Sequence, residues 1–359
     1  MSATPENPSP ALPETPAVLI DLPVVRRNIA RFQHYADAHG LKVRPHIKTH
    51  KLPAIAQMQL AAGAIGITCQ KVSEAEAMVA GAPEIRDVLI TYNIVGAGKL
   101  ARLAALARKV DLSVVADSEA VVAGLSATFA AAPRPLAVLV ECDTGARRCG
   151  VASPEEAAAL ARTIATAPGL VFGGLMTYPP VGAAAAVETF MTTAKALIEA
   201  SGILVPVVTS GGTPSMMHAA EAPVTTEYRP GTYVYNDRSL VERGVCGWED
   251  CALTVLATVV SVPAPDRAIV DAGSKTLTSD LLGLTGYGHV LGRPDIAIDQ
   301  LSEEHGRLVS KGPISLHVGD TVRIVPNHAC VVTNMVDAVY ALDEGRVERW
   351  PVPARGCIT

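Results

Sequence analysis

The sequence predicts an α/β protein with a parallel (β/α)8 barrel followed by a C-terminal all-β domain. Between residues 15 and 240, short apolar segments alternate with amphipathic segments of helical spacing, which is typical of a parallel sheet covered by helices. After residue 240 the helical stripes stop, and Val-rich runs separated by Gly, Pro and Asp indicate β-strands. The 359 residues exceed what one hydrophobic core usually supports, so we expect two domains.

The N-terminal part predicts a disordered lead-in, a strand and a helix. Residues 1–14 are rich in Pro, Ser and Glu and lack a hydrophobic pattern. Residues 15–20 predict an apolar strand, after which Asp21 is a good N-cap. The helix that follows carries one apolar stripe at spacings of three and four residues, formed by Leu22, Val25, Ile29, Phe32 and Ala36.

The same strand-helix unit then repeats along the chain. Ser73 and Ser153 are each followed by a Glu three residues later, and this pattern predicts a capped helix start at both serines. About eight units over residues 15–240 favour a closed barrel, although periodicity alone also allows an open parallel sheet. Residues 241–359 form the predicted β-domain.

Composition excludes several partners. The formal net charge is −5 without a long basic run, so we expect no nucleic-acid partner. No apolar segment reaches the roughly 20 residues that a bilayer requires, so we expect no membrane span. The seven cysteines are odd in number and form no CxxC pair, and the N-terminus lacks a signal-peptide pattern. These features indicate a cytoplasmic protein.

The segment from Arg44 to Lys51 concentrates cationic side chains after the second strand. If that strand continues, alternation places Arg44, His46, Lys48 and His50 on one inward face. Such a cluster is stable beside a bound anion, and it lowers the pKa of a lysine that acts as a nucleophile. The alternative is a solvated basic loop.

Two further patterns suggest ligand sites. Ser210, Gly211, Gly212 and Thr213 lie between a strand and a helix, where backbone N–H groups can bind phosphate, although turns also use such glycine pairs. His328 and Cys330 are one residue apart, so on a strand both would face the same way and reach one metal ion. Alone, this pair is a weak signal.

An ordered set of motifs resembles the D-threonine aldolase and D-serine dehydratase family of pyridoxal-phosphate enzymes, which have an alanine-racemase-like fold of type III. The motifs cover nearly the whole chain after residue 14: TPAVLID, RPHIKTHK, QKVSEAEAM, DTGARRCGV, SGGTPS, EYRPGTYVYND, DAGSKTLTSD, SEEHG and PNHAC. The resemblance implies that Lys48 holds pyridoxal 5'-phosphate. It also implies that the first strand joins the β-domain, which periodicity does not indicate.

The resemblance implies roles for further residues. Gly231 and Tyr233 would complete the phosphate cradle, and Gln70, Arg148 and Tyr178 would lie near the pyridine ring. His328 and Cys330 would bind a divalent metal, either zinc, manganese or magnesium. His50 is a candidate for the base that acts on the substrate hydroxyl. A homodimer is also implied.

The implied activity is metal-assisted cleavage of a 3-hydroxy-D-amino acid, as when D-threonine gives glycine and acetaldehyde. The alternative from the same site is dehydration of D-serine to pyruvate and ammonia. Gln70 resembles the aldolase branch, whereas Cys330 resembles the dehydratase branch. An amino-acid racemase and a non-catalytic cofactor carrier are further alternatives, but the carriers resemble the barrel alone.

Overall fold

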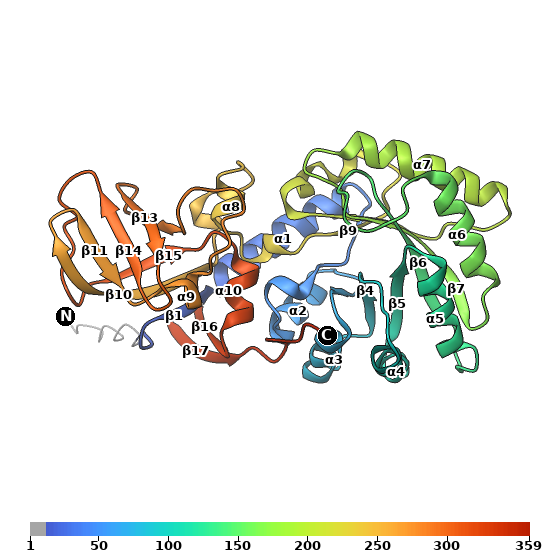
Figure 1. Ribbon diagram of the computed structural model, residues 1–359, viewed down its shortest axis with the longest axis horizontal. Helices are drawn as coiled ribbons and strands as arrows, with labels where there is room; N and C mark the ends of the chain where they lie inside the picture. Colours follow the sequence, from blue (N-terminus) through green and yellow to red (C-terminus); the bar gives the residue numbers. More distant parts are fainter. Residues whose placement is uncertain (1–11) are drawn as a thin grey trace, which may run out of the picture. The chain divides into compact units, whose positions relative to one another are not determined.

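The computed structural model describes residues 12–359, which divide into two compact units (Figure 1). The barrel unit comprises Ile29–Tyr233 and Gly356–Thr359. The β unit comprises the described residues up to Asn28 together with Val234–Arg355. The predicted lead-in over residues 1–14 lies almost entirely outside the described residues.

The barrel unit is built on a curved parallel sheet. Within residues 12–359 it has eight strands in the order β2-β9-β8-β7-β6-β5-β4-β3, and a bridge between His46 and Thr68 joins its two ends. This arrangement confirms the predicted parallel barrel. The strands are β2 (Lys42–Val43), β3 (Ile67–Cys69), β4 (Asp87–Ile90), β5 (Asp111–Ala116), β6 (Leu136–Cys142), β7 (Leu170–Thr177), β8 (Val208–Gly211) and β9 (Glu227–Arg229).

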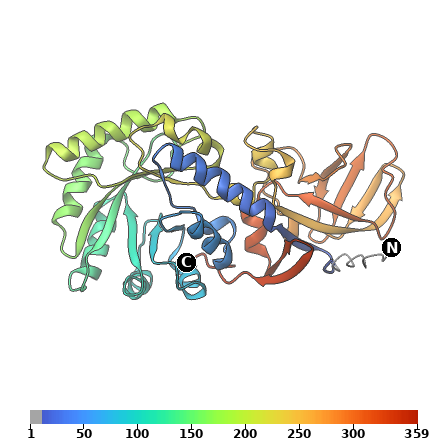
Figure 2. The same ribbon diagram turned by 180° about the vertical axis from the view of Figure 1, so that it is seen from behind.

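Helices follow these strands and lie outside the curved sheet (Figures 1 and 2). Four buried side chains from neighbouring strands, Leu89, Val115, Leu139 and Met176, pack into one hydrophobic cluster. The elements between the strands are η1 (Ile47–Thr49), α2 (Pro53–Ala61), α3 (Val72–Gly81), α4 (Ala97–Leu106), α5 (Glu119–Phe129), α6 (Pro154–Thr166), α7 (Ala184–Ala200), η2 (Thr213–Glu221) and η3 (Thr232–Val234).

Helix α1 (Leu22–Ala38) has the predicted start and apolar stripe. The Asp21 carboxylate accepts the Val24 N–H at 3.0 Å, as an N-cap does. All five stripe residues are buried. Burying this one face stabilises the helix far more than its intrinsic propensity does.

The two predicted serine caps differ. Ser153 caps α6 by accepting the Glu156 N–H at 3.2 Å. The prediction for Ser73 is wrong, because the N-cap of α3 is Lys71 and the Ser73 hydroxyl donates instead to the carbonyl of Thr359 at 2.7 Å. The Ser73 hydroxyl is therefore bonded to Thr359, 286 positions away in the sequence, and does not cap the helix as the local pattern predicted.

The β unit is built on a mostly antiparallel sheet, which confirms the predicted C-terminal β-domain. Strand β1 (Ala17–Asp21) pairs with β10 antiparallel and with β16 in parallel, so the first strand belongs to this sheet and not to the barrel. The resemblance implied this placement, whereas periodicity did not. The other strands are β10 (Leu253–Ala264), β11 (Arg267–Val270), β12 (His289–Val290), β13 (Ile296–Leu301), β14 (Gly306–Ser310), β15 (Thr321–Val325), β16 (Ala338–Asp343) and β17 (Arg346–Pro351).

Four short helices complete the β unit as described over residues 12–359: α8 (Arg238–Val241), η4 (Trp248–Asp250), α9 (Ser274–Leu277) and α10 (Ala329–Met335). Across residues 12–359, no helix combines the length and the apolar character needed to cross a membrane.

Candidate active site

Lys48 lies on a helical turn rather than on a strand. Strand β2 ends at Val43, His46 forms the isolated bridge to β3, and η1 then covers Ile47–Thr49. The predicted alternation of Arg44, His46, Lys48 and His50 on one face is therefore wrong, because the chain leaves the extended conformation after His46. The Lys48 side chain itself is half-buried.

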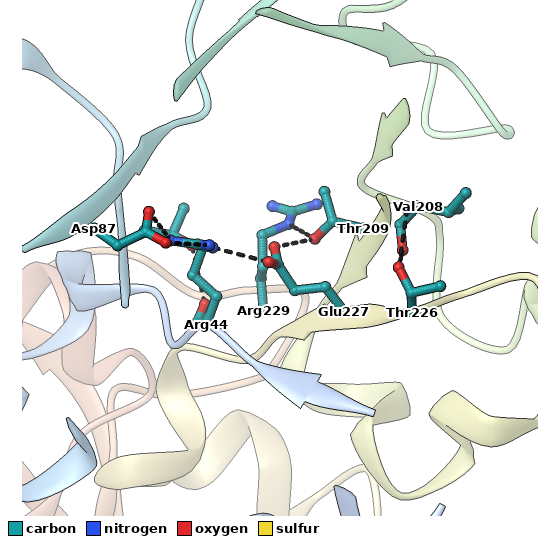
Figure 3. A network of polar contacts seen from close by, with 8 residues as sticks. Arg44, Asp87, Val208, Thr209, Thr226, Glu227 and Arg229 are labelled. Atoms are coloured by element: carbon teal, nitrogen blue, oxygen red, sulfur yellow. Dashed lines mark hydrogen bonds and ion pairs between the residues drawn. The ribbon is translucent and has the colours of Figure 1, made fainter. Parts of the chain in front are cut away.

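Arg44 is neutralised by protein carboxylates and needs no bound anion. Its guanidinium lies between Asp87, with atoms 2.7 Å apart, and Glu227, with atoms 2.9 Å apart (Figure 3). Glu227 also accepts the Thr209 hydroxyl at 2.8 Å, and Thr209 in turn accepts from Arg229 at 2.9 Å. This network links strands β4, β8 and β9 to the segment that follows β2 through charge-assisted hydrogen bonds.

His46 connects the lysine turn to Gln70. Its Nδ1 accepts the backbone N–H of Lys48 at 3.3 Å, so Nε2 carries the proton and donates to Gln70 Oε1 at 3.0 Å. Gln70 Nε2 donates to the Thr91 carbonyl at 2.9 Å, which fixes the amide orientation. Burial, with the charge of Lys48 nearby, lowers the pKa of His46 well below its usual value, so the ring is neutral.

The two predicted phosphate segments meet at Thr213. Its hydroxyl oxygen accepts the N–H groups of Gly231 and Tyr233, each at 3.2 Å. A Cβ added at Gly231 would lie 3.3 Å from the His46 carbonyl oxygen and 3.2 Å from Thr49 Oγ1. Only glycine at 231 fits comfortably this close to the lysine turn.

The segment from Ser210 to Gly212 leads directly into Thr213 and lies near the Tyr178 ring. Ser210 and Gly211 are buried, and Gly212 has a φ of +126°, a conformation that side chains rarely adopt. The carbonyl of Gly212 accepts the Tyr228 hydroxyl at 2.9 Å, and a Cβ added at Gly212 would lie 3.9 Å from the Tyr178 ring. Gly212 thus lies near the predicted ring-contacting tyrosine.

Tyr178 also lies near two cations. Lys48 Nζ is 5.9 Å from the centre of its ring, and Arg148 Cζ is 4.8 Å from it. Both distances are within the range of cation–π attraction. Tyr178 is 40% exposed and Arg148 is exposed, so the described part of the barrel unit leaves these groups accessible to a ligand.

Glu141, at the end of β6, is a buried carboxylate beside this cluster. Burial and the nearby charge of Asp117 raise its pKa to about 7, although Arg148 and Arg229 act in the opposite direction. Its side chain is 4% exposed. Sequence reasoning did not single it out.

His50 differs from the other predicted residues. It is fully buried, and its Nδ1 accepts the Leu52 N–H at 3.1 Å. Burial lowers its pKa to about 3, so it is neutral. These contacts shape the turn after Lys48, and the role of His50 as the base that acts on the substrate hydroxyl stays a prediction.

The predicted metal pair lies at the start of α10 and not on a strand. His328 is the N-cap of this helix and Cys330 belongs to its first turn. The strand argument is therefore wrong, yet the two side chains are together, because Cys330 is a hydrogen-bond partner of the imidazole. Although burial disfavours the charged form, Cys330 and Asp280 raise the pKa of His328 to about 9.

Two carboxylates that sequence reasoning missed surround this pair. Asp280 Oδ2 lies 2.6 Å from His328 Nδ1. Asp237, which is fully buried, caps α8 and accepts the N–H of Ala329 at 3.0 Å, between the two predicted ligands. Both acids end recognised motifs, DAGSKTLTSD and YVYND, and this position was the signal available in the sequence.

Family models match both units. Residues 20–239 match the N-terminal domain of alanine racemase, and residues 252–342 match the putative serine dehydratase domain. The parallel barrel with its lysine turn thus places the chain among the alanine-racemase-like proteins, the pyridoxal-phosphate enzymes of fold type III. Within them, the chain belongs to the D-threonine aldolase and D-serine dehydratase family.

Full-length relatives are lyases of D-amino acids. A D-threonine aldolase from Arthrobacter sp. is 36% identical, over 96% of this chain and 93% of that protein. A 3-hydroxy-D-aspartate aldolase from Paracoccus denitrificans is 34% identical, over 97% and 95%. A D-threo-3-hydroxyaspartate dehydratase from Delftia sp. is also 34% identical, over 94% and 96%.

Solved structures agree with these relationships. D-threonine aldolase from Filomicrobium marinum superimposes with a TM-score of 0.89 at 34% identity, covering 96% of this chain and 97% of that chain. The D-threo-3-hydroxyaspartate dehydratase is known as a His-to-Ala variant and as a Cys-to-Ala variant in metal-free form, the latter with a TM-score of 0.83 at 33% identity over 94% and 97%. The two replaced residues are two positions apart, as His328 and Cys330 are.

Proposed function

We propose that this protein cleaves 3-hydroxy-D-amino acids, converting D-threonine to glycine and acetaldehyde with pyridoxal 5'-phosphate and a divalent metal ion. The observation that carries the proposal is the 36% identity to a D-threonine aldolase along almost the whole of both chains. Both parts of the predicted machinery, the lysine turn and the His-Cys pair, are present in that shared length.

The residues of the barrel unit fit the cofactor. The Gly231 and Tyr233 N–H groups and the Thr213 hydroxyl converge beside the lysine turn, where they bond to one another. A bound phosphate would replace these mutual hydrogen bonds with donors of the kind that suit it. The same turn carries the Lys48 amine, which would hold the cofactor aldehyde. We assign Ser210, Gly211, Gly212, Thr213, Gly231 and Tyr233 to the phosphate, and Gln70, Arg148 and Tyr178 to the ring.

The residues of the β unit fit a divalent ion. The imidazole of His328 and the thiol of Cys330 lie together and are donors that suit zinc, while manganese and magnesium prefer oxygen donors. We assign His328 and Cys330 as the ligands.

When bound, pyridoxal phosphate supplies an electron sink for negative charge at Cα, and the metal supplies a Lewis acid for the β-hydroxyl. The chain's own residues prepare this chemistry. The neutral His46 holds the Lys48 backbone without adding a competing cation. Arg148 and Tyr178 remain accessible beside the Lys48 amine and can orient an anionic ligand.

Dehydration is the second candidate, and the Cys330 position favours it. The metal-free Cys-to-Ala variant concerns a dehydratase, and this chain has the same His and Cys spacing. Elimination from D-serine would give pyruvate and ammonia, and elimination from D-threonine would give 2-oxobutanoate and ammonia.

Product analysis decides between the two. The purified protein, loaded with pyridoxal phosphate and Zn²⁺ or Mn²⁺, is incubated with D-threonine, D-serine and 3-hydroxy-D-aspartate. We expect glycine and an aldehyde in equal amounts from D-threonine, without ammonia. Keto acid and ammonia without glycine would overturn the aldolase proposal, and interconversion of enantiomers with the metal removed would indicate a racemase.

We also propose that the protein works as a cytoplasmic homodimer on free D-amino acids. All seven cysteines are free thiols, which supports a reducing compartment. Sedimentation of the purified protein tests the dimer directly.

A further inference from the structure

We propose that Asp280 is a positioning residue for the metal site, holding His328 so that its Nε2 faces the ion. This inference rests on the proposed metal site and adds a residue to it. The contact that carries it joins Asp280 Oδ2 to His328 Nδ1 at 2.6 Å, across 48 positions of sequence.

The contact fixes which ring nitrogen is available. A carboxylate at Nδ1 keeps the proton on that nitrogen, so a metal ion that displaces the other ring proton binds at Nε2. Carboxylates paired with metal-bound histidines in this way orient the ring and raise its basicity. The imidazole is 24% exposed and the carboxylate 37% exposed, so the pair is neither sealed in the core nor fully solvated.

The local backbone holds Asp280 in place. Its N–H donates to the Thr278 hydroxyl at 3.0 Å, and its Oδ1 accepts the Leu282 N–H at 3.3 Å. One carboxylate oxygen is thus occupied by its own loop, and the other faces His328. The Asp280 side chain therefore cannot rotate freely away from the imidazole.

Thr278 shows that this placement has an energetic cost. It is a buried β-branched residue with a φ of +68°, a conformation that such residues rarely adopt. Strain of this kind persists where the surrounding structure requires one position of the chain. Here the strained residue belongs to the loop that holds Asp280 beside His328.

A second anchor acts on the backbone between the ligands. Asp237 accepts the Ala329 N–H, and the backbone N–H groups of Arg238 and Ser239 donate to Pro326 and Asn327 at 3.0 and 3.3 Å. This contact fixes the main chain of the His-x-Cys segment, while Asp280 fixes the ring. Because Asp237 is fully buried and caps a helix, Asp280 is the better residue to test.

The test measures Zn²⁺ affinity of the full-length protein directly, by competition with a chromogenic chelator. The variants are Asp280→Ala, Asp280→Asn and His328→Ala, with Asp299→Asn as the matched control. Asp299 is an acid of similar exposure in the same unit, paired with Arg307 at 2.8 Å. Circular dichroism of the metal-free variants checks that each is folded.

We expect Asp280→Ala to weaken Zn²⁺ binding about 10- to 100-fold, as loss of such partners does. Asp280→Asn should recover part of the affinity, since an amide oxygen can still accept from Nδ1–H, and Asp299→Asn should change nothing. In the Co²⁺-substituted Asp280→Asn protein, the thiolate-to-metal absorption of Cys330 should persist.

Unchanged affinity in both Asp280 variants, with affinity lost in His328→Ala, would overturn this inference and leave the metal site standing. Equal or absent binding in the wild type and His328→Ala would instead overturn the metal site. If Asp280→Asn and Asp280→Ala lose affinity as completely as His328→Ala, with an altered Co²⁺ ligand-field spectrum, Asp280 is a direct ligand and the positioning role is wrong.

Discussion

The imidazole of His46 accepts the backbone N–H of Lys48 at 3.3 Å, while its other nitrogen donates to Gln70. The ring thus acts as the N-cap of the turn that carries the proposed cofactor lysine. It is neutral because it is buried near Lys48, and a neutral ring is required for Nδ1 to accept. This contact leads to the first prediction.

Replacing His46 by Ala should weaken pyridoxal-phosphate binding about five- to tenfold, because one hydrogen bond of about 1 kcal/mol no longer holds the lysine turn. Titration of the cofactor followed by absorbance measures the change. His34→Ala, an exposed histidine on α1, is the control and should leave affinity unchanged. Equal affinity in all three proteins would contradict the role of His46.

Lys48→Ala should abolish the visible absorption band that the cofactor shows once its aldehyde has condensed with a lysine. The reason is chemical, since alanine has no amine to condense. The spectrum of the protein incubated with pyridoxal phosphate measures it. Lys42→Ala is the control, because that exposed lysine lies on the same segment but carries no proposed role. A band that survives in Lys48→Ala would show that another lysine holds the cofactor.

Gly231→Ala should lower both stability and cofactor affinity. The new Cβ meets Thr49 Oγ1 at 3.2 Å and the His46 carbonyl at 3.3 Å, so the lysine turn must shift. We expect a loss of about 1 kcal/mol in the free energy of unfolding, measured in urea. Gly98→Ala in α4 is the matched control: it meets no atom within 4 Å and should gain about 0.5–1 kcal/mol.

Glu141→Gln should stabilise the cofactor-free protein at alkaline but not at acid pH. The pKa of Glu141 is raised from 4.5 to about 7, so its favourable contribution is complete below about pH 4.5 and is lost as pH rises through 7. Gln resembles the protonated form, and the difference from wild type should grow to about 3 kcal/mol above pH 8. Urea unfolding at the two pH extremes measures this; an equal difference at both would contradict the raised pKa.

The pattern of the sequence predicted the architecture wherever local rules govern it. The stripe from Leu22 to Ala36 and the Ser153 cap depend on neighbours within a few residues, and both are confirmed. Ser73 failed because its partner, Thr359, is distant in sequence. The partner strands of β1, which are β10 and β16, are also distant in sequence. Only the resemblance predicted that β1 joins their sheet.

The candidate site follows the same division. Motifs predicted Lys48, the glycines at 211, 212 and 231, and the His328–Cys330 pair. These residue types suit a cofactor aldehyde, a phosphate and a metal ion, respectively. The supporting groups were missed, because Asp280 and Asp237 end recognised motifs but have no distinctive spacing from His328. They meet the His-x-Cys segment only through folding. Periodicity also misjudged the segment after Val43, where a single turn replaces the strand.

The ion-pair chain that runs from Asp87 through Arg44 to Glu227 limits how this barrel can diverge. Loss of Arg44 or Glu227 alone leaves the other charge uncompensated in the interior, whereas exchange of the whole set for apolar residues of equal volume can be neutral. Homologues should therefore keep or lose these three residues together. A designer who wishes to change the interior should replace them in one step rather than singly.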